Sequence, residues 1–249
     1  MKIMKFKTIV AFLLLMLFIP SMQVAGQNKD WANLKRYAKS DSVIMSQPNN
    51  GKRVVFLGNS ITDGWYRVHP NFFKDNGYIG RGIGGQTSFQ FLVRFRQDVI
   101  NLKPAIVIIN AGTNDIAENT QPYNQDYTYG NIISMVELAQ ANGIFTILSS
   151  ILPSNNYFWH KYVKDIPAKI TSLNNRIKKY AKEHDIPYID YYSSLVVKET
   201  GAFIPELTKD GVHPNANGYD VMEKIVKKHI DKAFVKVQKQ RAKNHISGK

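Results

Sequence analysis

Short apolar runs, each closed by glycine, proline, serine or asparagine, are the feature that most constrains the fold of this chain. Such runs are typical of strands buried on both faces of a parallel sheet, where polar alternation is absent. Five of them occur: RVVFLG (53–58), GYIGRG (77–82), AIVIIN (105–110), IFTILSS (144–150) and PYIDY (187–191). They predict a sheet of parallel strands joined by crossover segments.

Helical periodicity fills the intervals between these runs. A helix is predicted from about Ser88, because apolar residues repeat on one face: Phe91, Leu92, Phe95 and Val99. Two further helices are predicted over about 127–142 and 167–184. A last helix is predicted to begin near Ala216, and a segment with helical character, about 29–46, precedes the first strand. Alternating strands and helices predict a three-layer α/β fold, and 249 residues suit one domain.

The first residues have the pattern of a secretory signal peptide. Lys2, Lys5 and Lys7 precede the apolar run IVAFLLLMLFIP, and small residues follow near Ala25. We therefore expect a signal peptide over residues 1–25, a single domain over 26–249, and no stable membrane span after cleavage. This implies an exported protein of a bacterial envelope, periplasmic or extracellular, while an uncleaved anchor remains the alternative.

Composition excludes several classes of site. The chain has no cysteine, which rules out disulfides, thiolate nucleophiles and thiolate metal ligands. Its formal charge is +14, or +11 without the three lysines of the signal peptide, and much of the excess lies in residues 223–249. There, lysines alternate with apolar residues at helical spacing, which predicts a packed helix with a solvated basic face and a frayed end. Without an aromatic platform, this pattern does not favour nucleic acid as a partner.

Polar residues gather where the predicted strands end. In open α/β sheets, ligands bind outside the carboxyl ends of the strands. The segments expected at that rim are GNSITDG, GRGIGGQTS, NAGTND, SSILPSNNYFWH and, before the last helix, TKDGVHPNANGY. These ends bring serine, histidine, aspartate, asparagine and glycine to one edge of the sheet.

Three of these residues suit nucleophilic catalysis. The hydroxyl of Ser60 needs a base, and His213 offers one, with Asp210 three residues earlier to orient its ring. A more ordinary interpretation is that Ser60 caps the following helix and that Asp210 and His213 form a local cap.

Acyl transfer also needs donors for a developing oxyanion. The backbone N–H groups of Ser60 and Gly85 and the side-chain amide of Asn114 are the candidates, although both GIGGQTS and GTND could be simple turns. Asp63 and Asp115 are expected to brace loops, and His160 to lie at the surface. The six histidines form no metal motif, and GIGGQTS lacks the lysine of a phosphate loop, so no metal or cofactor is predicted.

Together, GNSIT, GIGGQTS, AGTND and DGVHPNANGY resemble, in order and spacing, the four sequence blocks of the SGNH or GDSL hydrolase superfamily. The resemblance implies a flavodoxin-like α/β/α sandwich with five parallel strands in the order 2-1-3-4-5. It also implies a Ser60–His213–Asp210 triad and an oxyanion hole formed by Ser60, Gly85 and Asn114. One departure is Asn59, where the family usually has aspartate; this side chain can still bond to nearby backbone.

Substrate specificity is expected to come from two aromatic segments at the rim, GWYRVHPNFF (64–73) and PSNNYFWHKY (153–162). Candidate substrate contacts are Trp65, Tyr66, Phe158 and Trp159, although aromatic residues also pack loops onto sheets. The sequences of the first and last blocks, GNSITDGW and DGVHPNANGY, are most similar to those of the platelet-activating-factor-acetylhydrolase-like and carbohydrate-esterase branch of the family. This implies a serine esterase for short acyl groups, such as acetyl groups on glycans. A lysophospholipase or arylesterase, and a non-catalytic glycan-binding module, are the alternatives; oligomeric state is left open.

Overall fold

The computed structural model describes residues 30–247, of which residues 31–247 lie in one compact unit. The predicted signal peptide, residues 1–25, lies outside the described residues. Among the described helices, none combines the length and the apolar character that crossing a bilayer requires.

A five-stranded parallel sheet forms the centre of the molecule, in the order β2-β1-β3-β4-β5. Its strands are β1 (Val54–Gly58), β2 (Tyr78–Gly82), β3 (Ile106–Ile109), β4 (Phe145–Ser149) and β5 (Tyr188–Ile189). Each lies within one of the five predicted runs. The predicted strand order and the α/β/α fold are confirmed.

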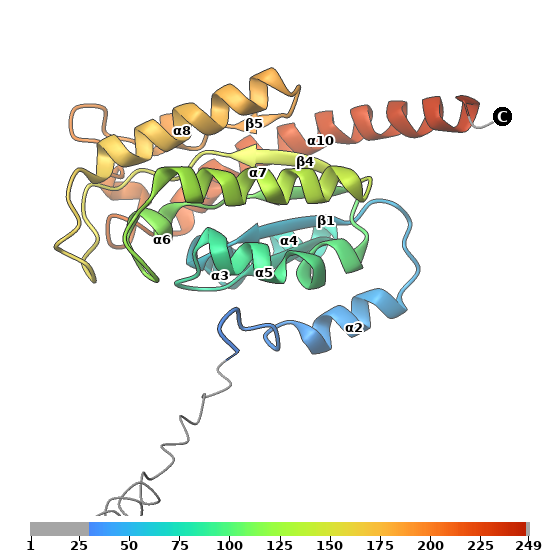
Figure 1. Cartoon of the computed structure of the whole chain (residues 1–249), viewed down its shortest axis with the longest axis horizontal. Helices are drawn as coiled ribbons and strands as arrows, with labels where there is room; N and C mark the ends of the chain where they lie inside the picture. The colour runs from blue at the N-terminus through green and yellow to red at the C-terminus, as the bar shows by residue number, and fades with distance from the viewer. Residues whose placement is uncertain (1–29, 248–249) are drawn as a thin grey trace, which may run out of the picture. The chain divides into compact units, whose positions relative to one another are not determined.

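Two layers of helices cover the sheet. α5 (Ser88–Asp98), α7 (Gln125–Ala141) and α8 (Ile166–Glu183) pack on one face and lie in front of the sheet in Figure 1. α3 (Ser60–Val68), α4 (Pro70–Asn76) and α10 (Ala216–Ser247) pack on the other. The short helices are α2 (Ala38–Ser46), η1 (Ile100–Leu102), α6 (Thr113–Ile116), α9 (Tyr192–Leu195) and η2 (Pro205–Leu207). Alternate side chains of the strands face the two layers, and β1 and β3 contribute apolar side chains to both.

The segment after β1 differs from the expected rim loop. It forms α3 and α4, because Asn59 caps α3, Pro70 occupies the first turn of α4, and Gly77 ends α4 with φ 64°. Trp65 lies on the inner face of α3 and is 2% exposed. Its indole ring stacks on Phe72, with ring centroids 5.3 Å apart. Trp65 is therefore a core residue, and the expectation that it lines a substrate pocket is corrected.

The last helix follows the predicted pattern. The predicted apolar stripe of α10 is buried against the sheet, and Lys224, Lys227, Lys228 and Lys232 lie on the exposed side. The helix extends from Ala216 to Ser247. The buried residues of the predicted stripe are Met222, Val226, Ile230, Ala233 and Val237, and Tyr219 at the start of the helix is buried as well.

The turn between β1 and α3 packs closely against β2. A Cβ atom on Gly82 would lie 2.2 Å from the backbone nitrogen of Asp63 and 2.8 Å from the carbonyl oxygen of Asn59. A Cβ atom on Gly58 would lie 2.0 Å from Thr62 Oγ1. These two glycines allow the start of α3 to lie directly on the neighbouring strand.

Gly82→Ala should therefore destabilise the fold, by about 3 kcal/mol, since backbone atoms must move to admit the methyl group. Gly130→Ala is the matched control, because Gly130 is inside α7 and a Cβ atom there meets nothing within 4 Å. That control should be neutral or stabilising by about 1 kcal/mol. Urea unfolding measures both, and equal free energies of unfolding for the two variants would contradict the close approach.

Candidate active site

Three predicted residues meet at the carboxyl edge of the sheet. Ser60 Oγ lies 2.9 Å from His213 Nε2, and His213 Nδ1 lies 2.8 Å from Asp210 Oδ2. Ser60 is the first residue of α3, while Asp210 and His213 precede α10. Segments 153 residues apart in the chain therefore bring a hydroxyl, an imidazole and a carboxylate into one hydrogen-bonded line.

The hydroxyl of Ser60 is not used to cap the helix. Asn59 is the N-cap residue of α3, and its side-chain oxygen accepts a hydrogen bond from the Ile61 backbone N–H at 2.9 Å. This is the backbone hydrogen bond expected of Asn59 in place of aspartate. Because Asn59 satisfies the helix terminus, Ser60 Oγ is left to contact His213.

Local hydrogen bonds fix the loop that carries His213. The carbonyl oxygen of His213 accepts from Thr208 Oγ1 at 2.8 Å and from the Lys209 N–H at 2.9 Å. Asn215 accepts from the Gly218 N–H at the start of α10 and donates to the carbonyl of Glu206. The imidazole is thus held between an ordered turn and a helix terminus.

Asp210 interacts with both the ring and the backbone of the histidine loop. Its Oδ1 accepts from the N–H groups of Val212 and His213, at 3.0 and 2.8 Å. Partial burial alone would raise the pKa of Asp210, but the hydrogen bonds and charge of His213 outweigh it and lower that pKa. The carboxylate is therefore favoured in its ionised form, in which its Oδ2 accepts a hydrogen bond from the Nδ1–H group of His213.

The candidate oxyanion donors lie on neighbouring loops. Asn114, in α6 after β3, donates from Nδ2 to the carbonyl of Gln86 at 2.9 Å. Gly85, with φ 76°, lies in the same loop as Gln86, and its carbonyl accepts from Asn119 at 2.9 Å. A Cβ atom on the adjacent Gly84 would lie 3.8 Å from Ser60 Cβ. We call residues 83–87, between β2 and α5, the glycine loop. This loop therefore runs beside Ser60 and holds Asn114.

Asp115 braces the same region. This buried carboxylate accepts from the N–H and hydroxyl of Ser88 at 3.0 and 2.5 Å, and from Thr128 Oγ1 at 3.3 Å. Burial raises its pKa, although these donors act in the opposite direction. Asp63 makes ion pairs with Arg36 and Arg67. Asp115 has the loop-bracing contacts expected of it, whereas Asp63 lies within α3 and pairs with one arginine of the same helix and one that precedes α2.

The predicted aromatic contacts separate into different environments. The Trp159 ring lies 6.3 Å from the His213 ring, and its indole N–H donates to Asn119 Oδ1 at 2.9 Å. Phe158 packs edge-on against Trp159 and is 51% exposed. Tyr66 is 44% exposed but packs against Phe73, over the edge strand β2.

His160 differs from its expected place at the surface. It is half-buried, and its Nδ1 lies 2.6 Å from the carbonyl oxygen of Ala117. This contact joins the aromatic segment 153–162 to the residue that follows α6.

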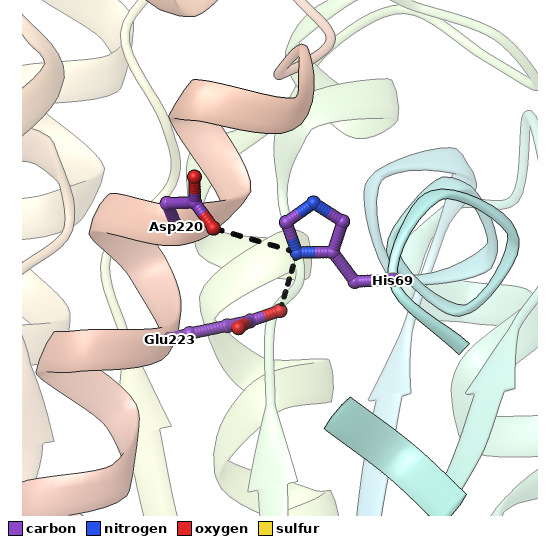
Figure 2. Close-up of side chains that lie close together, drawn as sticks. All are labelled: His69, Asp220 and Glu223. Atoms are coloured by element: carbon purple, nitrogen blue, oxygen red, sulfur yellow. Dashed lines mark hydrogen bonds and ion pairs between the residues drawn. The ribbon is translucent and has the colours of Figure 1, made fainter. Parts of the chain in front are cut away.

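A cluster that sequence patterns missed joins α3 to α10. Figure 2 shows His69, at the end of α3, pointing toward Asp220 and Glu223 on α10. His69 Nδ1 lies 2.7 Å from Glu223 Oε1 and 3.8 Å from Asp220 Oδ1, and Trp65 Nε1 donates to the same Glu223 oxygen at 2.9 Å. We call these four residues the α3–α10 latch. It connects the helix that begins with Ser60 to the helix that follows His213.

The latch is also where donor atoms could hold a metal ion. Within the described part of the chain, one donor atom each from His69, Asp220 and Glu223 lie within 4.8 Å of one another. Nitrogen and carboxylate donors of this kind suit zinc or manganese. Only the i, i+3 spacing of Asp220 and Glu223 could have indicated the cluster from sequence, since His69 lies 154 residues before Glu223.

Glu223→Ala should lower the free energy of unfolding by about 1–3 kcal/mol, because it leaves the buried indole N–H of Trp65 without its acceptor. Lys224→Ala, on the exposed face of the same helix, is the control and should change stability little. Chemical denaturation monitored by tryptophan fluorescence measures both variants. Equal stabilities would show that the latch does not join α3 to α10 energetically.

Comparison with known proteins identifies the family. The GDSL-like lipase/acylhydrolase family matches residues 56–221. A GDSL-like lipase from Bacteroides thetaiotaomicron is 59% identical and superposes with a TM-score of 0.80, over 82% of this chain and 100% of that one.

Two more distant relatives have named activities. The thioesterase 1/protease 1/lysophospholipase L1 of Escherichia coli is 26% identical, over 65% of this chain and 75% of its own length. An acetylxylan esterase of Xylanibacter ruminicola is 22% identical, over 70% of this chain and 42% of its own. The chain belongs to the GDSL-like lipase/acylhydrolase family and is a carboxylic ester hydrolase.

Proposed function

We propose that Ser60 is the nucleophile of this hydrolase, His213 its general base, and Asp210 the residue that orients His213. The observation that carries the proposal is the line of two hydrogen-bond contacts, Ser60 Oγ to His213 Nε2 at 2.9 Å and His213 Nδ1 to Asp210 Oδ2 at 2.8 Å. This is the relation between nucleophile, base and orienting carboxylate that activates a serine.

The first half-reaction forms an acyl-enzyme. As Ser60 Oγ attacks the ester carbonyl carbon, its proton passes to His213 Nε2, and the carbonyl oxygen becomes negatively charged. The N–H groups of Ser60 and Gly85 and the amide of Asn114 are the proposed donors to that oxygen. When the tetrahedral intermediate collapses, the bond to the leaving oxygen breaks and His213 returns the proton to it.

Water completes the cycle. His213 removes a proton from the water that attacks the acyl carbon, the bond to Ser60 Oγ breaks, and the proton returns to Ser60. In both halves the imidazole becomes positively charged, and the ionised carboxylate of Asp210 stabilises it. The lowered pKa of Asp210 supports this role, because the carboxyl stays ionised while the imidazole changes charge.

We infer that the substrate is a short acyl ester, such as an acetyl ester, on a carbohydrate. Trp159 lies beside His213 and Phe158 is half-exposed next to it, and aromatic faces of this kind stack on sugar rings. The likeness to an acetylxylan esterase supports the same substrate class. Export by the predicted signal peptide, to the periplasm or beyond, would bring the enzyme to polysaccharides outside the cytoplasm.

Ser60→Ala should reduce kcat/KM for p-nitrophenyl acetate by roughly 10⁴-fold or more, because the attacking oxygen is removed. His213→Ala should cost a similar amount, and Asp210→Ala less, since a poorly oriented imidazole still accepts protons. Ser42→Ala, an exposed serine of α2, is the control. Ester hydrolysis at the wild-type rate by Ser60→Ala would exclude this nucleophile.

Trp159→Ala should raise KM for an acetylated xylo-oligosaccharide by about tenfold, with p-nitrophenyl acetate turnover changed less than about twofold, because only the sugar would use the aromatic face. Tyr127→Ala, an exposed aromatic residue of α7, should affect neither substrate. Acetate release and chromogenic turnover measure the two reactions. No acetate from glycans, together with active cleavage of lysophospholipids, would favour the lysophospholipase alternative.

A further inference from the structure

A buried arginine lies beneath the candidate active site and takes no part in the proposed reaction. Arg94 of α5 is 0% exposed and pairs with Asp98 at 2.7 Å. Its Nη2 donates to the carbonyl oxygens of Gly58, at 2.9 Å, and Arg81, at 3.0 Å, which lie at the carboxyl ends of β1 and β2. Its Nε donates to Gln86 Oε1 at 2.7 Å. One side chain therefore links the strand before Ser60 to the glycine loop.

Gln86 forms hydrogen bonds with three different parts of the molecule. Its Oε1 accepts from Arg94, its Nε2 donates to the carbonyl of Ala32 at 2.7 Å, and its backbone carbonyl accepts from Asn114 Nδ2 at 2.9 Å. Because an asparagine amide has two N–H donors, this contact fixes one and leaves the other for a substrate oxygen.

Ala32 belongs to a segment that packs along α5 and the edge strand. We call residues 31–46 the N-terminal strap. Its carbonyl groups accept from Gln90 and Gln97 of α5, through Trp31 and Leu34, and its Asp41 pairs with Arg81 at 2.5 Å. The glycine loop is thus held through Gln86 by two contacts, one with Ala32 of the strap and one with the buried guanidinium of Arg94.

We propose that Gln86 is a positioning residue of the oxyanion hole, and that Arg94 and the N-terminal strap act through it to orient the amide of Asn114. This inference rests on the proposed function. An oxyanion donor accelerates the reaction only if its N–H already points to where negative charge develops. A buried guanidinium has few alternative acceptors, so the contact with Arg94 holds the side chain of Gln86 in one position. The backbone carbonyl of Gln86, which accepts from Asn114, is held with it.

Gln86→Ala should lower kcat for p-nitrophenyl acetate by about 10- to 100-fold and leave KM within about twofold, since oxyanion contacts strengthen in the transition state. The NMR signal of the Asn114 side-chain amide should shift and exchange faster with solvent. Gln125→Ala is the matched control: it removes a glutamine contact between α7 and α8, in which Gln125 Oε1 accepts from Ser172 Oγ at 2.9 Å, and it leaves the contacts of the strap, Arg94 and Asn114 in place. It should alter stability only.

A second variant keeps the test decisive if Gln86→Ala does not fold. Gln86→Glu retains an oxygen acceptor for Arg94 but loses the N–H that reaches Ala32. It should lose about three- to tenfold in kcat, with the same Asn114 signal perturbed. Wild-type kcat and an unchanged Asn114 signal in the folded variants would overturn the inference. An inactive wild-type enzyme would instead refute the proposed function, while the Asn114 signal would still decide the role of Gln86.

Discussion

The close contact between the β1–α3 turn and strand β2 is the constraint on which the rest of the site depends. Gly58 and Gly82 have no room for a side chain, so the first turn of α3 lies directly on the edge of the sheet. Ser60 is therefore carried by a backbone that can shift little relative to β1, β2 and the glycine loop. Asn114 follows the neighbouring strand β3, whereas His213 and Asp210 have to arrive from a loop that precedes the last helix.

The packing of α10 brings His213 to Ser60. His213 precedes this helix, and α10 packs on the same sheet face as α3. Tyr219 donates to the carbonyl of Ile61 at 2.8 Å, and Glu223 accepts from Trp65 and His69. The helix that begins with Ser60 and the helix that follows His213 are thus joined at their first turns, through Tyr219 and Ile61, and again near the end of α3, through Glu223. Their buried contacts set the distance between hydroxyl and imidazole.

Most of the fold could be predicted because its determinants are local. The strands lie within short, largely apolar runs, although β2 also carries Arg81. Rim residues follow β1, β3 and β4 directly in the chain, whereas Asp210 and His213 come after α9 and η2. The aromatic segment after Ser60 was harder, because Pro70 interrupts its helical pattern and Trp65 could equally face solvent or core. Contacts such as His69–Glu223 and Arg94–Gln86 depend on how distant elements pack, and no local pattern encodes them. Asn114 was identified, but the carbonyl of Gln86 that holds its amide was not.

Labelling with a fluorophosphonate tests the central claim most directly, because this reagent captures a serine only where a base activates it. The account predicts a single covalent adduct, located on Ser60 by peptide mass spectrometry, with a labelling rate at least roughly 100-fold lower in His213→Ala. An adduct on another residue, or labelling of Ser60 at the same rate without the imidazole, would contradict it.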